Sequence, residues 1–152
     1  GLTGDKGPTG DKGPAGDSGT ASIDYYEDYL TSTVQMPTTG SWYAGPSLTL
    51  PAGTYLITAF VTFRRTATTA TIWFARLSDG TNHYASGQAY TPSVSGSCIT
   101  VSLSAIVTLT DTKTIMIQGT TSAGTTACLM INALSASTVG NNATKISAIK
   151  IG

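Results

Sequence analysis

Hydrophobic and polar residues alternate along much of the chain with a period of two, which is the spacing of a half-buried β-strand. The pattern is clearest in residues 54–63, where Leu56 and Phe60 share one face with threonines and larger apolar residues occupy the other. The segment is therefore predicted to be a long strand. The residues predicted to face the core are Tyr55, Ile57, Ala59, Val61 and Phe63.

Comparable runs occur through most of the chain after residue 31. The predicted strands are 70–77, 98–109, 113–119, 127–134 and 144–151, with shorter ones at 32–36, 47–50 and 83–90. Turn-forming residues separate them, such as Ser-Asp-Gly at 78–80, which is typical of a hairpin. About eight to ten strands with such turns indicate an all-β fold, namely a jelly-roll β-sandwich.

Some predicted strands are apolar on both faces, whereas a two-layer sandwich should leave one face of each strand in water. Burial against a neighbouring copy explains the second apolar face, and a threefold ring of such contacts closes on itself. We therefore expect a homotrimer. The residues predicted to form its interface are Leu56, Phe60, Met130, Leu134, Ile149 and Ile151.

The chain opens with seven consecutive triplets that each begin with glycine. In a collagen triple helix only glycine fits at the crowded axis, so this strict period predicts a trimeric stalk over residues 1–21, about 65 Å long at roughly 3.1 Å per residue. Pro8 and Pro14 directly follow a glycine, and the last position of the triplets holds no proline. The predicted axial residues are Gly1, Gly4, Gly7, Gly10, Gly13, Gly16 and Gly19.

Residues 22–34 are predicted to form a neck between this stalk and a head domain over residues 35–152. Ile23, Tyr26 and Leu30 follow one another at spacings of three and four, as in a minimal coiled-coil seam. An irregular linker explains the same segment equally well.

The formal net charge is zero and 11% of the residues are charged, which argues against a nucleic-acid partner. Arg64 and Arg65 are interpreted as a solvated strand end. No apolar run reaches the length of a membrane span. A neutral chain rich in serine, threonine, glycine and alanine suits a protein outside a cell or on a virion. Because the first residue is glycine, we expect the chain to be part of a longer protein.

Residues for catalysis or metal binding are scarce. His83 is the single histidine, no nucleophile-elbow motif is present, and the predicted head carries only Asp79 and Asp111 as acidic residues. We therefore expect no enzymatic activity, cofactor or metal site. The two cysteines, Cys98 and Cys128, lie in apolar runs that favour buried free thiols, although one disulfide remains an alternative.

Recognition is the better hypothesis, because loops at the ends of a sandwich usually carry it. Asparagine and aspartate can hydrogen-bond sugar hydroxyls, and an aromatic ring can pack on a sugar. A plain hairpin loop explains the same residues. The candidate loop contains Asp79, Asn82, His83, Tyr84 and Tyr90. Trp42 and Tyr43 form a second candidate, for which packing in the core or in an interface is the alternative.

Three segments of the head, LPAGTYLITAFVTF (50–63), LSAIVTLTDTKTIMIQG (103–119) and the terminal ISAIKIG (146–152), support a family resemblance. With the collagen-like stalk, the chain resembles the superfamily of tumour necrosis factor and complement globular heads. Gly53, Tyr55, Leu109, Asp111 and Ile149 occupy the places of that family's short motifs. More narrowly, it is similar to collagen-containing bacteriophage fibre and spike proteins. The resemblance implies a trimeric ten-stranded jelly roll but does not identify a ligand.

Two function classes follow from these observations. The first is a receptor-binding tip of a viral fibre or spike on the virion surface, which binds a host-cell receptor such as a glycan. The second is a structural or adhesive collagen-like protein on the surface of a bacterium or spore, whose head serves as a trimerisation domain.

Overall fold

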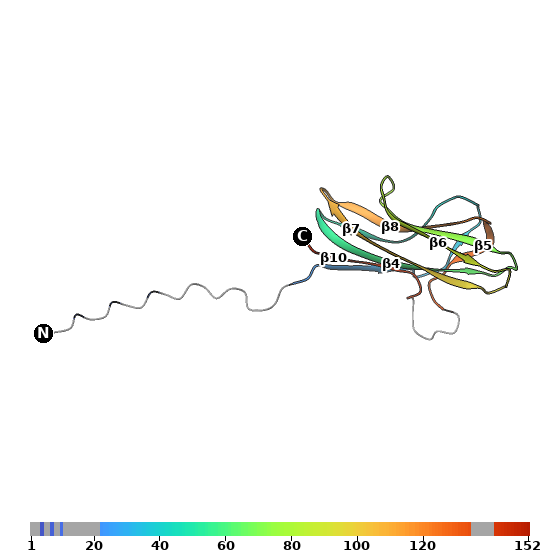
Figure 1. The fold of residues 1–152 in the computed structure, drawn as a ribbon, viewed down its shortest axis with the longest axis horizontal. Coiled ribbons are helices and arrows are strands. Elements are labelled where there is room, and N and C mark those ends of the chain that lie inside the picture. Colours follow the sequence, from blue (N-terminus) through green and yellow to red (C-terminus); the bar gives the residue numbers. More distant parts are fainter. Residues whose placement is uncertain (1–3, 5–6, 8–9, 11–21, 135–141) are drawn as a thin grey trace.

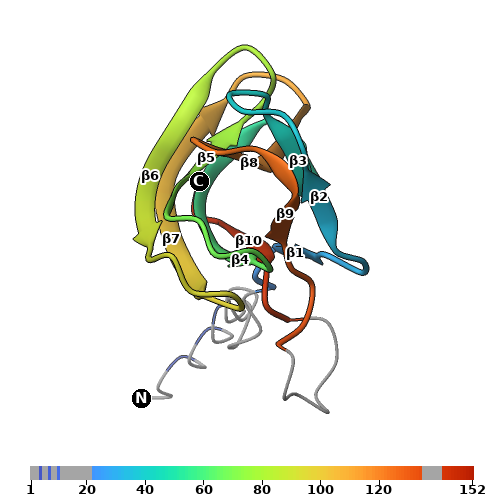
Figure 2. The same cartoon turned by 90° about the vertical axis from the view of Figure 1, so that its right-hand side faces the viewer.

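The structure is a computed structural model that describes residues 4, 7, 10, 22–134 and 142–152. Within these residues the chain forms ten β-strands and no helix, and the strands make two antiparallel sheets packed face to face (Figures 1 and 2). The strands are β1 (Tyr25–Tyr29), β2 (Val34–Met36), β3 (Tyr43–Leu50), β4 (Gly53–Arg65), β5 (Thr71–Ser78), β6 (His83–Thr91), β7 (Cys98–Leu109), β8 (Lys113–Thr121), β9 (Thr125–Met130) and β10 (Lys145–Lys150).

The first sheet is organised around β4, the longest strand. One edge of β4 pairs with β7 over Gly53–Arg64. The other edge pairs with β10 through Tyr55–Phe60 and with β9 through Phe63–Arg65. β1 extends this sheet beyond β10, and β2 extends it beyond β9. β4, with its 13 residues, thereby pairs with three other strands and connects the two parts of the sheet.

The second sheet has the strand order β3-β8-β5-β6. The chain crosses between the sheets on passing from β2 to β3, from β3 to β4, from β4 to β5, from β6 to β7, from β7 to β8 and from β8 to β9, which is the winding of a jelly roll. The all-β jelly-roll sandwich predicted from the sequence is therefore confirmed for the head. The collagen prediction for residues 1–21 lies almost entirely outside the described residues and stays a prediction.

The core lies between the two sheets and follows the predicted alternation of β4. The five residues expected to face inward are all buried: Tyr55, Ile57, Ala59, Val61 and Phe63. Phe63 stacks on Trp73 of β5, with ring centroids 5.1 Å apart. The Trp73 indole donates a hydrogen bond of 2.9 Å to Thr91 Oγ1, so its one polar atom is satisfied inside the core. At Gly119 a Cβ would lie 2.7 Å from Met130 Cε, so glycine lets the sheets approach here.

The head has two distinct ends. Residues 22–24 enter next to the turns at 51–52 and 110–112, and the C-terminus lies at this end as well (Figure 1). Gly152 accepts a hydrogen bond of 2.7 Å from the Thr54 amide, which fixes the C-terminus there. We call this the stalk-side end. The opposite, far end carries the loops at 66–70 and 92–97 (Figure 1).

The expectation for the neck is wrong at Tyr25–Tyr29, which form neither a coiled-coil seam nor an irregular linker. These residues are β1, paired in register with β10. Tyrosine favours a strand, and alternate side chains face opposite ways: the Tyr26 ring packs edge-on against Tyr55 with centroids 6.0 Å apart, while Tyr25 and Tyr29 are exposed. Pairing with β10 outweighs the weak helical spacing.

Three further expectations are corrected. Met130 is fully buried and faces the core instead of the outer surface, because it pairs directly with the inward-facing Phe63 of β4. Arg65 is also buried rather than solvated, and its Nη1 donates to Thr71 Oγ1, Ala123 O and Cys128 Sγ. Both cysteines are free thiols, but Cys128 alone is buried, whereas Cys98 is exposed at the start of β7.

Candidate functional site

The candidate loop is the β5–β6 hairpin, and Asp79 holds it together. Its Oδ1 accepts hydrogen bonds from the amides of Thr81 and Asn82, at 2.9 and 2.6 Å. Its Oδ2 accepts from Asn82 Nδ2 at 3.2 Å and from the Tyr84 hydroxyl at 2.6 Å. Gly80 has a φ of 94°, which a glycine adopts without strain in this turn. The predicted hairpin turn is thus confirmed, and most of its polar groups are already paired.

The same contacts shift two pKa values in opposite directions. The Tyr84 hydroxyl, followed by the turn amides, holds the pKa of Asp79 far below its ordinary range. Partial burial and the neighbouring Asp79 carboxylate raise the pKa of Tyr84 to about 12. Both residues therefore keep their pairing throughout the neutral range.

Of the other predicted loop residues, His83 is exposed, with Nδ1 3.0 Å from Ser78 Oγ. Tyr90 is exposed as well, but it lies near the other end of β6, opposite Ile72 in the ladder. The hairpin occupies the stalk-side half of the second sheet, because Ser78 pairs with Met116, near the β7–β8 turn (Figure 1). The structure therefore brings Asp79, Asn82, His83 and Tyr84 together and places Tyr90 apart from them.

We expect Asp79→Ala to destabilise the head by about 1–2 kcal/mol at pH 7, because it removes a charged acceptor of several hydrogen bonds from a partly exposed turn. A lowered pKa in the folded state means that this stability is complete above the unfolded value, about 3.9, and is lost as the pH falls below it. The difference in unfolding free energy between wild type and variant, measured in urea, should hold from pH 7 to 5 and shrink at pH 3. Asp111→Ala, which removes a loose 3.9 Å ion pair with Lys113, is the control. A difference that grows on acidification would contradict the assignment.

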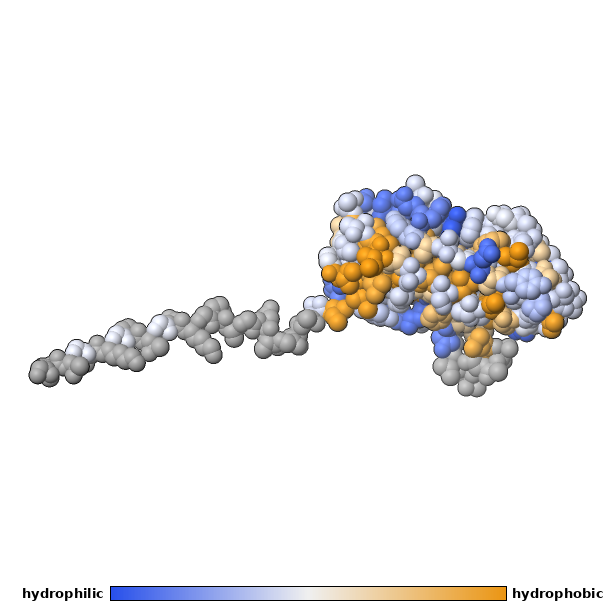
Figure 3. Space-filling view, viewed as in Figure 1, coloured by the Kyte–Doolittle hydropathy of each residue, from blue (hydrophilic) through white to orange (hydrophobic). Residues whose placement is uncertain are grey.

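The outer face of the first sheet carries an apolar row across four strands. Tyr25 pairs with Ile149, Ile149 with Leu56, and Leu56 with Ile106. All four side chains are exposed, Ile106 to 70%. Ile151, also exposed, lies two residues beyond Ile149 and so on the same face. Hydrophobic residues gather at this stalk-side end of the head (Figure 3).

Further from the stalk-side end than this row, the same face is more polar. Phe60, a predicted interface residue, is exposed there between Lys145 and Ser102. Lys145 Nζ makes a 3.0 Å ion pair with Glu27 on β1, and the Tyr25 hydroxyl donates to the same carboxylate. Those two contacts, with the Tyr25 hydroxyl foremost, lower the pKa of Glu27. The apolar row is therefore bordered by a fixed charged pair.

Of the predicted interface residues, Leu56, Phe60, Ile149 and Ile151 lie exposed on this face or continue it. Leu134 is exposed but follows β9 in a loop, outside the row. The sequence analysis missed Ile106 and Tyr25. The signal for Ile106 was present, since it opposes the alternating apolar face of residues 98–109. Tyr25 was missed because its strand was interpreted as a neck.

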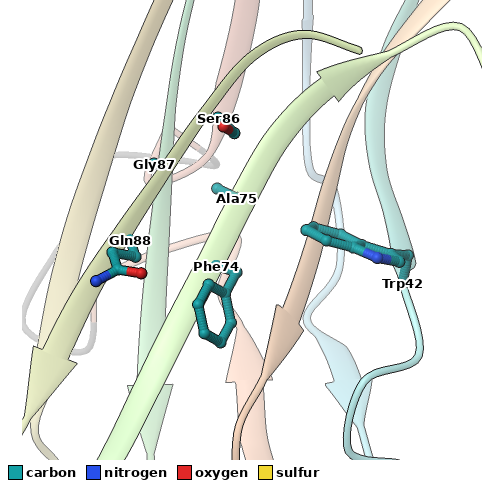
Figure 4. A pocket seen from close by; sticks show the side chains of 6 residues that line it. All are labelled: Trp42, Phe74, Ala75, Ser86, Gly87 and Gln88. Atoms are coloured by element: carbon teal, nitrogen blue, oxygen red, sulfur yellow. The ribbon is translucent and has the colours of Figure 1, made fainter. Parts of the chain in front are cut away.

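A cleft of about 430 Å³ opens on the outer face of the second sheet, lined by Trp42, Phe74, Ala75, Ser86, Gly87 and Gln88. The Trp42 ring points across β8 toward Phe74, and the Gln88 amide lies on the other side of Phe74 (Figure 4). Trp42 was one of the two residues of the second sequence candidate, and its ring is partly exposed here. Phe74 and Gln88 gave no sequence signal, because only the strand register places them beside one another.

No group of three or more histidine, cysteine, aspartate or glutamate side chains within the described residues is placed to hold a metal ion. In the same part of the chain, no helix has the length and apolar character needed to cross a membrane.

No protein-family model matches the chain, and no curated protein matches it in sequence. Its structure is similar to that of infectious bursal disease virus, Gx strain, with a TM-score of 0.49 and 14% identity over 86% of this chain and 32% of that chain. It is also similar to a Stig cyclase, Fisc, from Fischerella sp. TAU (TM-score 0.48, 13% identity, 92% and 82% covered). Eiger TNF from S. frugiperda is a third similar structure (TM-score 0.43, 12% identity, 88% of each chain covered). This chain spans about a third of the viral chain, and these similarities concern the fold alone.

Proposed function

We propose that the chain is the trimeric receptor-binding head of a viral fibre or spike, displayed on the virion surface at the end of a collagen-like stalk. The apolar row on the outer face of the first sheet is the observation that carries this proposal. It lies at the stalk-side end, next to residues 22–24, where a triple helix would bring three chains together.

The glycines of the stalk support the same stoichiometry. A Cβ added at Gly4, Gly7 or Gly10 would meet nothing within 4 Å in a single chain. A lone chain therefore gives no steric reason for glycine at these three positions. Close packing of three chains around one axis supplies that reason.

The head projects its second sheet and its far end away from the proposed trimer contact. A weak site on each subunit would then act three times, and linked copies can raise the overall affinity by about 10²–10⁴. This arrangement suits attachment to a cell surface bearing many copies of a ligand, such as a glycan.

Adsorption to cells tests the proposal and its candidate loop. The labelled trimer should adsorb to the cells of a host, and a variant with Asn82, His83 and Tyr84 all replaced by alanine should adsorb less while remaining trimeric. Thr110→Ala/Thr112→Ala, in the neighbouring β7–β8 turn, is the matched control and should adsorb as wild type does. Equal adsorption of the loop variant and wild type would remove this loop as the site.

A second candidate function is a structural or adhesive collagen-like surface protein of a bacterium or spore, with the head as its trimerisation domain. The internal pairing of Asp79, Asn82 and Tyr84 favours it, because these groups then serve the hairpin and not a ligand. Absence of adsorption by the wild-type trimer to every cell type tested would support this candidate over the first.

A further inference from the structure

The cleft on the second sheet is well placed for a ligand. It lies on the outer face of β5 and β6, whereas the apolar row lies on the outer face of the other sheet. Phe74 pairs with Thr120, near the end of β8, so the cleft belongs to the half of the head away from the stalk. A trimer formed through the first sheet would leave three such clefts open to solvent.

The rings of Trp42 and Phe74 form the apolar part of the cleft, and Arg76 fixes the orientation of the Trp42 ring. The Arg76 guanidinium lies 3.8 Å from the centroid of the Trp42 ring, a cation–π contact. Arg76 Nε also donates a hydrogen bond of 2.8 Å to Gln118 Oε1 on β8. Trp42 thus lies in a loop, but its ring contacts Arg76, which is itself fixed to β8 by Gln118, and this contact orders the ring before any ligand arrives.

The polar groups beside the rings have unused hydrogen-bonding capacity. Gln88 and Ser86 are exposed, and neither side chain makes a hydrogen bond within the described part of the chain. Thr120, the ladder partner of Phe74, is buried with its Oγ1 unpaired. Gln88 offers two donors and an acceptor, and Ser86 offers one donor and two lone pairs.

We propose that this cleft binds one hexopyranose ring of a cell-surface polysaccharide. The face of a pyranose that carries C–H groups is apolar and slightly positive, which suits the negative face of an aromatic ring. The hydroxyls at its rim suit the Gln88 amide and the Ser86 hydroxyl. The volume of the cleft, about 430 Å³, lies within the roughly 300–1,000 Å³ of small-molecule sites.

This inference deepens the proposed function and rests on it only for the cellular role of the site. An uncharged ligand is favoured because none of the described residues that line the cleft is acidic and because the Arg76 cation beside it is already covered by Trp42. Binding at a single shallow cleft is expected in the millimolar range.

Tryptophan fluorescence of the full chain tests the proposal directly. The two tryptophans differ sharply, since Trp42 is partly exposed and Trp73 is fully buried, so acrylamide should quench Trp42 preferentially. The probes are the methyl glycosides of glucose, galactose, mannose and N-acetylglucosamine, each titrated to 50 mM. At least one should protect Trp42 from acrylamide in a saturable way, and cyclohexanol, a ring of similar size with one hydroxyl, should not. Protection by none of the four, or equal protection by cyclohexanol, would overturn the proposal.

Two variants separate the cleft from the rest of the surface. Gln88→Ala should weaken binding of the active glycoside about three- to tenfold, as expected for one lost neutral hydrogen bond. Gln35→Ala is the matched control, because Gln35 is an exposed glutamine on β2 of the other sheet. The affinity of this variant for the glycoside should equal that of the wild-type protein. Equal affinities of all three proteins would place the sugar elsewhere and refute the assignment of this cleft.

Adsorption to cells then distinguishes the two proposals. Adsorption that persists unchanged in Gln88→Ala, with no glycoside protecting Trp42, would leave the receptor-binding head standing and refute the sugar cleft. Saturable sugar protection without adsorption to any cell would establish the cleft and refute the attachment role.

Discussion

If residues 22–152 assemble as the proposed trimer, replacing Leu56 and Ile149 together by lysine is expected to convert that trimer into monomers at micromolar concentration. The two side chains are neighbours in the apolar row, and each is 38% exposed in the single chain. Burying a fully exposed side chain of this kind contributes about 1.5–3 kcal/mol, so burying the part that is still exposed contributes roughly a third of that, and a lysine in its place adds the larger cost of desolvating a charge. The two changes per subunit should weaken association at least about a hundredfold.

The measurement is the molar mass by light scattering after size exclusion, over a series of protein concentrations. The matched control is Ile72→Lys/Val94→Lys, because Ile72 has the same 38% exposure but lies on the outer face of the second sheet. This control should remain trimeric. A wild-type head that is monomeric throughout the series would contradict assembly through the first sheet, and so would a trimer that survives in the lysine variant of the row.

Alternation along single strands was enough to predict the fold. The inward residues of β4 and the apolar face of β7 follow a strict period of two, and the turn at 78–80 carries residues that are typical of a hairpin. These signals are local, so a sequence can display them. They establish a sandwich, and the number of strands with its turns indicates a jelly roll.

The surfaces were harder to predict because they depend on register across strands. Ile106 becomes part of a row only because it pairs with Leu56, 50 positions earlier in the chain. Phe74 and Gln88 likewise meet only through the β5–β6 register, and nothing about either residue alone marks a cleft. Met130 was assigned to the wrong face because apolar residues on both sides of β9 left its direction ambiguous.

The predictions for the neck and for Arg65 were wrong for a different reason. Residues Tyr25–Tyr29 form a strand only when a neighbouring strand pairs with them, and that neighbour, β10, comes from the opposite end of the chain. Arg65 looks like a surface residue by type, yet the hydroxyl, carbonyl and thiol groups that accept its hydrogen bonds come from three later segments. Both cases are tertiary effects that override a local expectation.

Substitution of Trp73 by alanine should produce the largest loss of stability of any single change in the head. Trp73 is fully buried, stacks on Phe63 and donates a hydrogen bond to Thr91, so the variant leaves a large cavity and an unpaired hydroxyl. The expected cost is about 3–5 kcal/mol, out of a total of about 5–15 kcal/mol for a domain. At a fixed protein concentration, unfolding in denaturant followed by circular dichroism measures this cost. Trp73→Phe keeps the ring stack but loses the hydrogen bond, and should cost less, about 1–3 kcal/mol.

Trp42→Ala is the matched control on the surface, where about 0.5–1 kcal/mol is expected from the lost contact with Arg76. Equal losses for Trp42→Ala and Trp73→Ala would show that Trp73 is not at the centre of the core.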